Sequence, residues 1–119
     1  MTRPRPNWKT LRATLWERAE GRCEVSGVPL DPDTFDAHHR RPKGSGGTSR
    51  ENTDLVTNLL ALDPQAHNGG PGSVHGERIW ALENGYLIPK HEPEPRLFPV
   101  LWRGQRWVWL LPDGGTLDM

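Results

Sequence analysis

The chain has 119 residues, enough for one hydrophobic core but not for two full domains. It carries 15 Lys or Arg against 15 Asp or Glu, with 13 Gly and 12 Pro and a mean hydropathy of −0.74, which predicts a small, loop-rich fold. No apolar run approaches the length of a membrane span and no secretory leader is visible, so we expect a cytoplasmic location without a membrane partner. A single cysteine excludes an internal disulfide and a four-cysteine zinc site.

The neutral total conceals an uneven distribution of charge. Residues 1–50 hold ten Lys or Arg against six acids, a net charge of +4, and the remaining residues have a net charge of −4. A neutral protein is a poor general binder of polyanions, yet one basic half can still face an anion. The N-terminal half is therefore the predicted anion-facing half.

Helical spacing of apolar residues dominates the start of the chain. Asn7 is a suitable N-cap and Gly21 a suitable stop, which predicts a helix over residues 8–20. A turn-rich segment then leads to a short strand over residues 34–39. The polar, glycine-containing stretch 40–57 is expected to form a functional loop outside the core.

The middle of the chain predicts a buried strand over residues 58–62, followed by a turn over residues 67–72. We expect a helix that is capped by Ser73 and ends at Asn84. His75 would then project from the core-facing stripe of that helix.

Two apolar segments near the C-terminus, residues 97–102 and 106–111, predict a β-hairpin. It should lie at a sheet edge, because Pro99 cannot donate a hydrogen bond to a neighbouring strand. Trp107 and Trp109 alternate along the second strand and share one face. We favour packing of both on the core over base stacking or a partner surface, which stay open as alternatives.

Four of the five histidines fall within 38 residues: His38 and His39 are adjacent, and His67 and His75 follow. Imidazole is the usual nitrogen ligand of borderline divalent ions and the usual base near neutral pH, so the cluster points to a metal-assisted reaction. Each histidine taken alone is as readily a surface or hydrogen-bonded core residue. His91 lies in a proline-rich connector and has no assigned role.

Around these histidines the sequence resembles the HNH endonuclease family. The match includes Asp36-Ala37-His38-His39-Arg40-Arg41-Pro42, Gly46-Gly47, Asn58-Leu59-Leu60-Ala61-Leu62, His67, His75 and Gly85. Residues 69–72 then look like a four-residue loop insertion. The resemblance covers about residues 8–88 and implies an α+β fold with a ββα-metal (His-Me finger) core at about 22–88. An N-terminal helix and a C-terminal β-hairpin extension at about 96–112 would complete a single domain over 1–119.

The resemblance also implies roles for the matching residues. His39 would be the general base, and Asn58 would fix the loop and orient His39, although Asn58 alone is also an ordinary turn residue. His38, His67 and His75 would hold one divalent metal ion, with Mg²⁺, Mn²⁺, Ni²⁺ and Zn²⁺ all open. Such a set suits phosphodiester hydrolysis, which needs an activated water and neutralisation of the charge that grows on the phosphate.

Arg40, Arg41 and Lys43 directly follow the predicted base. They are expected to neutralise DNA phosphates, although three basic residues in a polar loop are often simply solvated. No recognition helix is visible, so we expect weak sequence specificity. Asp36 shares a strand face with His38, where it either hydrogen-bonds a ligand histidine or is solvated, and it is left out of the ligand set.

Many members of the family carry a structural zinc site made of two cysteine pairs. Here Cys23 remains, but Ser26, Asp63 and Ala66 stand at the other three positions. The resemblance therefore implies that this zinc is absent and that the chain folds without it. Packing by the tryptophan-rich hairpin is expected to hold the long loops instead.

These observations favour a metal-dependent DNA endonuclease that nicks or cuts, in a compact monomeric form. Small members of the family are common in bacteriophages, and some act beside the packaging terminase, so a terminase or another DNA-processing protein is a candidate partner. The main alternative is a non-catalytic module of the same fold that binds DNA or a terminase. A structural metal domain unrelated to nucleic acid would leave Arg40, Arg41 and Asn58 unexplained.

Overall fold

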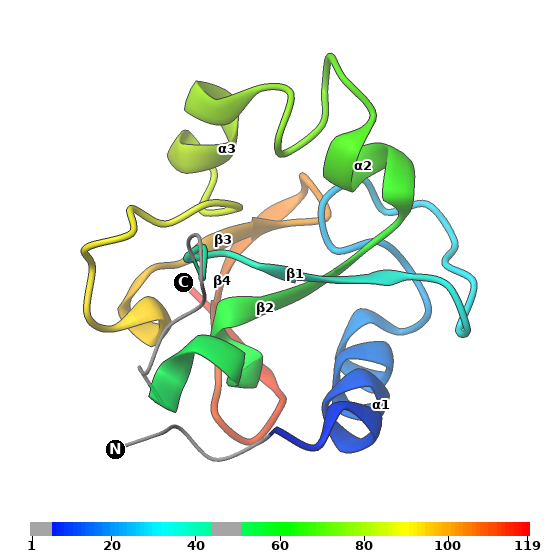
Figure 1. The fold of residues 1–119 in the computed structure, drawn as a ribbon, viewed down its shortest axis with the longest axis vertical. Helices are drawn as coiled ribbons and strands as arrows, with labels where there is room; N and C mark the ends of the chain where they lie inside the picture. Colours follow the sequence, from blue (N-terminus) through cyan, green and yellow to red (C-terminus); the bar gives the residue numbers. More distant parts are fainter. Residues whose placement is uncertain (1–5, 44–50) are drawn as a thin grey trace.

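The computed structural model describes residues 6–43 and 51–119, which form an α+β fold of short helices and two small antiparallel sheets (Figure 1). One sheet pairs β1 (Asp36–His39) with β2 (Leu59–Leu62), and the other has the order β3 (Val100–Trp102), β4 (Arg106–Leu110), β5 (Thr116–Asp118). The predicted α+β class is confirmed. None of the helices in the described part of the chain is long and apolar enough to cross a membrane.

Helix α1 (Trp8–Ala19) forms where periodicity predicts it. The Asn7 side chain accepts a hydrogen bond of 3.2 Å from the Thr10 amide, which satisfies one of the unpaired amides at the helix start. The helix ends where Glu20 and Gly21 adopt positive φ angles of 55° and 71°. Leu15 on its inner side is completely buried, and the helix packs against β2.

Strand β1 begins at Asp36, two residues later than predicted, and pairs with β2 so that His38 lies opposite Leu60 and His39 opposite Leu59. All four residues of β2 are buried. Successive side chains of a strand point to opposite faces. His38 and His39 therefore project from opposite faces of β1.

The segment after β1 is not the exposed loop that we predicted. It includes two 3-10 turns, η1 (Glu51–Asp54) and η2 (Val56–Asn58), in which Thr53 and Thr57 are buried. Arg40 and Arg41 are buried as well. A polar segment can enter the core when its polar groups find hydrogen-bond partners, as they do here. The Gly46-Gly47 part of the motif lies outside the described residues.

Two helices differ from the prediction. The predicted turn over residues 67–72 is partly helical, because Asp63 caps a short helix, α2 (Pro64–Asn68), that includes His67. Helix α3 (Arg78–Glu83) is shorter than predicted and is not capped by Ser73. His75 lies in the turn before α3, and Ile79 is 74% exposed, so the predicted core-facing stripe is wrong.

The C-terminal hairpin forms as predicted but gains a third strand, β5, that lies beyond the predicted extension. Pro99 directly precedes β3, which is an edge strand as expected. Val108 and Leu110 of β4 face the core, whereas Trp107 is 38% exposed and Trp109 is half-buried. The preferred packing of these two tryptophans on the core is therefore wrong. A short 3-10 turn, η3 (Pro95–Leu97), precedes this sheet.

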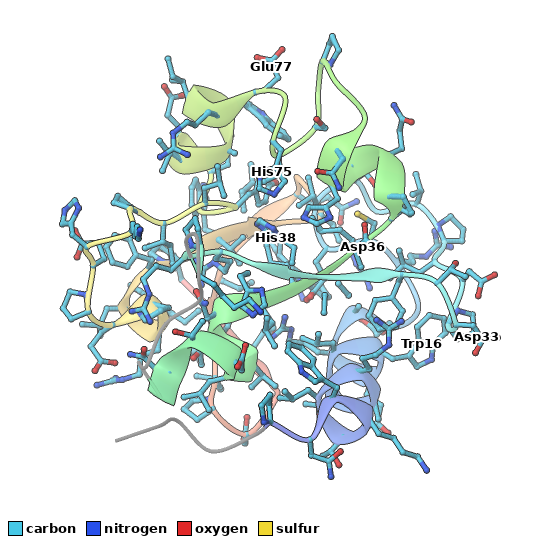
Figure 2. All side chains as sticks on the ribbon, in the orientation of Figure 1. Trp16, Asp33, Asp36, His38, His75 and Glu77 are labelled. Atoms are coloured by element: carbon cyan, nitrogen blue, oxygen red, sulfur yellow. The ribbon has the colours of Figure 1, made fainter. Side chains whose placement is uncertain are left out.

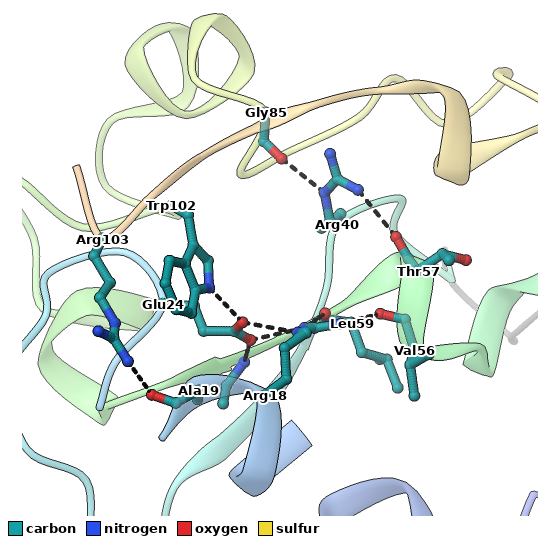
Figure 3. A network of polar contacts seen from close by, with 11 residues as sticks. Arg18, Ala19, Glu24, Arg40, Val56, Thr57, Leu59, Gly85, Trp102 and Arg103 are labelled. Atoms are coloured by element: carbon teal, nitrogen blue, oxygen red, sulfur yellow. Dashed lines mark hydrogen bonds and ion pairs between the residues drawn. The ribbon is translucent and has the colours of Figure 1, made fainter. Parts of the chain in front are cut away.

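A buried charge pair joins the pieces of the core (Figure 3). Glu24 is fully buried, and its carboxylate accepts hydrogen bonds of 2.7–2.9 Å from the Arg18 guanidinium, the Trp102 indole and the Ala61 amide. Arg18 also donates to the carbonyls of Val56 and Leu59, at 2.8 and 2.6 Å. One carboxylate thus links α1, β2 and β3.

Replacing Glu24 with Gln should lower the free energy of unfolding by about 3–5 kcal/mol, because Arg18 would become an uncompensated buried charge. The amide nitrogen of Gln would also face groups that are all donors. Urea denaturation followed by tryptophan fluorescence measures the loss. Glu17→Gln, at an exposed position of α1, is the control and should change stability by less than about 0.5 kcal/mol. Equal effects of the two substitutions would contradict this role for Glu24.

Candidate metal centre

Three histidines from different parts of the chain come together beside β1. Figure 2 shows two of them, His38 and His75, next to each other. His38 comes from β1, His67 from α2 and His75 from the turn before α3, and their ring nitrogens all lie within 4.8 Å of one another. His67 Nε2 lies 3.2 Å from His38 Nδ1 and 3.2 Å from His75 Nε2. Two nitrogens on one tetrahedral Zn²⁺ are separated by about 3.3 Å. The predicted ligand set therefore comes together with a spacing that fits one shared ion.

Hydrogen bonds on the outer nitrogens orient two of the three rings. His38 Nε2 lies 2.7 Å from the Tyr86 carbonyl oxygen, to which it donates, so that Nδ1 carries the lone pair. His67 Nδ1 lies 2.9 Å from a carboxylate oxygen of Asp36, which leaves Nε2 as the ligand atom. The open question about Asp36 is thus answered: it hydrogen-bonds the ligand His67. Partners of this kind hold metal-binding histidines in the correct tautomer.

Burial keeps His38 in the neutral form that binds metal. The residue is 2% exposed, and burial lowers its pKa from 6.5 to about 3, against the opposing effect of the Tyr86 hydrogen bond. Partial burial also lowers the pKa of His75, with further contributions from the neighbouring charges of His67 and Arg78. A metal ion therefore has no proton to displace from His38 at neutral pH.

The cluster opens to solvent on one side. His38 is buried, the His67 side chain is 18% exposed, and His75 is exposed. Three protein ligands with one open side are the arrangement of a catalytic metal site, which keeps coordination positions for water and substrate. A substrate would approach from the His75 side.

The turn that carries His75 is held by close backbone packing. The Ser73 hydroxyl donates to the Gly70 carbonyl at 2.5 Å and accepts from the Gly76 amide at 3.0 Å. A Cβ atom on Gly76 would lie only 2.0 Å from the Gly70 carbonyl oxygen, so no larger residue fits there. The His75 amide donates to the His67 carbonyl at 3.1 Å. This ordered turn, rather than a longer helix, places His75.

His39 projects from the opposite face of β1 and has a carboxylate partner. Its Nε2 lies 2.7 Å from Asp54 Oδ1, and the two side chains are 16% and 6% exposed. The Trp8 ring packs edge-on against it, with 5.9 Å between ring centroids. A carboxylate that accepts a hydrogen bond from Nε2 holds the ring proton at that nitrogen. Sequence reasoning missed Asp54, which lies far from His39 in the chain and belongs to no spacing pattern.

Asn58 fixes the loop, but the hydrogen bonds of its side chain go to Arg41 and Thr53 rather than to His39. Its Oδ1 accepts from the Arg41 amide at 2.8 Å, and its Nδ2 donates to the carbonyls of Arg41 and Thr53 at 3.2 and 2.8 Å. The predicted orientation of His39 by the Asn58 amide is therefore wrong. Asn58 instead holds the segment that presents Asp54.

Arg40 and Arg41 point into the protein, so the prediction that they contact DNA phosphates is wrong. Arg40 is fully buried and donates to the main-chain carbonyls of Thr57, Gly85, Pro95, Phe98 and Pro99. Figure 3 shows the bonds to Thr57 and Gly85. Arg41 is 1% exposed and donates to the carbonyls of Glu92 and Pro93. Burial and the nearby Arg18 lower the pKa of Arg40 to about 9, which leaves it cationic at neutral pH. Lys43 is exposed, and its predicted DNA contact stays a prediction.

The positions at which the family resemblance implies a lost zinc site are occupied by residues that make other contacts. The Ser26 hydroxyl donates to Asp63 at 3.2 Å, and Cys23 and Ala66 both pack in the core. Trp102 of the C-terminal sheet is buried and donates to Glu24, and the replacement of a zinc site by this hairpin stays a prediction. In the described part of the chain, the three-histidine cluster is the one group with metal-site geometry.

Comparison with protein-family models, with curated proteins and with solved structures finds no match to this chain. What the protein does is therefore inferred from the site. Three neutral nitrogen donors suit borderline divalent ions, of which Zn²⁺ and Ni²⁺ are examples. His39, which is held by the Asp54 carboxylate, directly follows His38 in the chain. The site therefore combines nitrogen donors that could hold a divalent ion with a histidine that could transfer a proton.

Asp36→Asn should weaken metal binding about 10- to 100-fold, because the His67 ring loses its carboxylate partner. Titration calorimetry with Zn²⁺ measures the affinity. His67→Ala removes the ligand itself and should weaken binding further. Asp33→Asn, at an exposed position, is the control and should bind normally. Normal binding by His67→Ala would remove His67 from the ligand set.

Arg40→Lys should destabilise the protein by more than about 2 kcal/mol, because one ammonium cannot satisfy carbonyls that the guanidinium reaches in several directions. Lys43→Ala, three residues later and exposed, should change the free energy of unfolding by less than about 0.5 kcal/mol. Thermal and urea denaturation measure both. A fully stable Arg40→Lys protein would contradict a structural role for the guanidinium.

Proposed function

We propose that this protein is a metal-dependent DNA endonuclease of the HNH type, with β1, β2 and the helical segments that follow them as its ββα-metal core. The observation that supports this most directly is the placement of the histidines. A three-histidine cluster lies on one side of β1, and the next residue in the chain, His39, is held by a carboxylate on the other. The order of these residues matches the family resemblance seen in the sequence.

Each residue has a defined task in the proposed hydrolysis. His38, His67 and His75 would hold the divalent ion, which supplies charge neutralisation at the scissile phosphate and at the leaving oxygen. His39 would act as the general base that accepts a proton from the attacking water. Asp54 then stabilises the imidazolium that forms, through its 2.7 Å contact with Nε2.

The end of β1 is where the two halves of the site meet. His39 is the last residue of the strand, and its Cα lies about 3.8 Å from that of His38. A phosphodiester placed across the end of the strand can face the ligand cluster on one side and the base on the other. Asn58 supports this arrangement because it bonds both ends of the segment that follows β1, at Arg41 and Thr53.

The donor set favours a borderline ion in this proposal. Imidazole nitrogens suit Zn²⁺ and Ni²⁺, whereas Mg²⁺ prefers oxygen ligands and keeps much of its water shell. We therefore expect activity with Zn²⁺ or Ni²⁺ to exceed activity with Mg²⁺. A location in the cytoplasm and a monomeric state belong to the same proposal.

The second candidate function is a non-catalytic module that binds DNA or a terminase-like partner. The outer face of the C-terminal sheet favours it, because Trp107 is 38% exposed and Leu117 is 56% exposed there. Exposed apolar residues that gather on one face are typical of an interaction surface. A bacteriophage origin and a link to DNA packaging are supported by the family resemblance alone.

Supercoiled plasmid incubated with the protein and Zn²⁺, Ni²⁺, Mn²⁺ or Mg²⁺ should become nicked or linear, as followed on agarose gels. His39→Ala should reduce the rate by about 10²- to 10⁴-fold, the usual contribution of a general base. His91→Ala is the matched control, because the His91 side chain is 84% exposed and lies outside the site. Wild-type protein that cuts nothing with any of these ions would favour the binding module.

Calorimetry on the same variants separates the two roles of histidine. His39→Ala should bind metal nearly as wild type does, because its ring projects from the other face of β1. Loss of metal binding in this variant would instead place His39 among the ligands.

A further inference from the structure

The burial of Arg40 and Arg41 raises the question of which cation meets the substrate phosphate. Affinity for DNA comes largely from Lys and Arg side chains that neutralise phosphates. Such a cation has to be exposed and has to lie near the open side of the histidine cluster. That side is the one where His75 is exposed.

We propose that Arg78 makes this phosphate contact. Arg78 is exposed, begins α3 and follows His75 by three residues. In the part of the chain that the structure describes, its guanidinium forms no hydrogen bond or ion pair that would occupy it. Because only Gly76 and Glu77 separate it from His75, Arg78 lies beside the open side of the cluster. The inference rests on the proposed function, because it takes DNA as the ligand.

The neighbouring acid, Glu77, does not compete for the same space. Figure 2 shows Glu77 at the outer end of the turn, away from His75 and His38. The Glu77 amide donates to the Ser73 carbonyl at 2.9 Å, which ties the start of α3 to the rigid turn that carries His75. Arg78 is thereby held at a fixed position relative to the ligand cluster.

A cation at this position has effects of opposite sign on the metal and on DNA. It repels a bound divalent ion and attracts a phosphate. Arg78→Gln should therefore bind metal as tightly as wild type or more tightly, and it should bind DNA more weakly. If Arg78 only supported the turn, its substitution would lower the affinities for metal and for DNA together. The pair of measurements thus separates a phosphate contact from a structural role.

The experiment uses the Zn²⁺-loaded full chain with His39→Ala as background, so that the DNA stays intact. Fluorescence anisotropy gives the affinity for a labelled 20-base-pair duplex at several KCl concentrations. Arg78→Gln should weaken binding by about 3- to 10-fold and lower the slope of log affinity against log salt by about 1, for any duplex sequence. Arg78→Lys should keep the slope. Arg96→Gln, with a side chain 56% exposed on η3, is the control and should change neither quantity.

An unchanged salt slope in Arg78→Gln, or a loss of Zn²⁺ binding measured by calorimetry, would overturn the inference. Plasmid nicking by the protein with native His39 is scored separately. If the salt slope depends on Arg78 but the protein never nicks plasmid, the endonuclease proposal is rejected and the phosphate contact is kept. If the protein nicks plasmid but the salt slope is unchanged in Arg78→Gln, the endonuclease proposal is kept and the Arg78 contact is rejected. A duplex that stays unbound at every salt concentration overturns the Arg78 contact together with DNA as the ligand.

Discussion

The rest of the structure depends on the buried carboxylate of Glu24. A negative charge can stay in the core only while donors surround it, and here those donors are Arg18, Trp102 and the Ala61 amide. Meeting all three requires α1, β2 and β3 to lie side by side. Because β1 pairs with β2, the positions of His38 and His39 follow from a charge pair that neither of them touches.

Sequence patterns predicted correctly those elements that are determined by residues close together in the chain. The Asn7 cap and the following apolar spacing predict α1, and the uninterrupted apolar run of β2 predicts a buried strand. The same reasoning failed for Arg40, because a basic residue in a polar stretch resembles a surface residue. Its partners, including the carbonyls of Gly85 and Phe98, come from distant segments and leave no pattern in the sequence.

The candidate site shows the same division between local and distant causes. His38, His67 and His75 come together as predicted, because the residue types and their order carry the signal. Asp36 was recognised in the sequence as a possible partner of a ligand histidine, but the other groups that orient the rings were not predictable in the same way. Tyr86 acts through its main-chain carbonyl, which any residue could supply, and Asp54 reaches His39 only through the fold of the segment after β1. His75 was predicted to lie in a helix, because the close approach of Gly76 to the Gly70 carbonyl, which shapes the turn, belongs to no apolar spacing pattern.

Cys23, the one cysteine of the chain, is completely buried in the core. A buried thiol is shielded from reagents that attack exposed thiolates. A cysteine introduced at any exposed position would therefore be the thiol that a maleimide dye or spin label reaches. The native residue can stay in place, so distances across this molecule can be measured spectroscopically without disturbing the core.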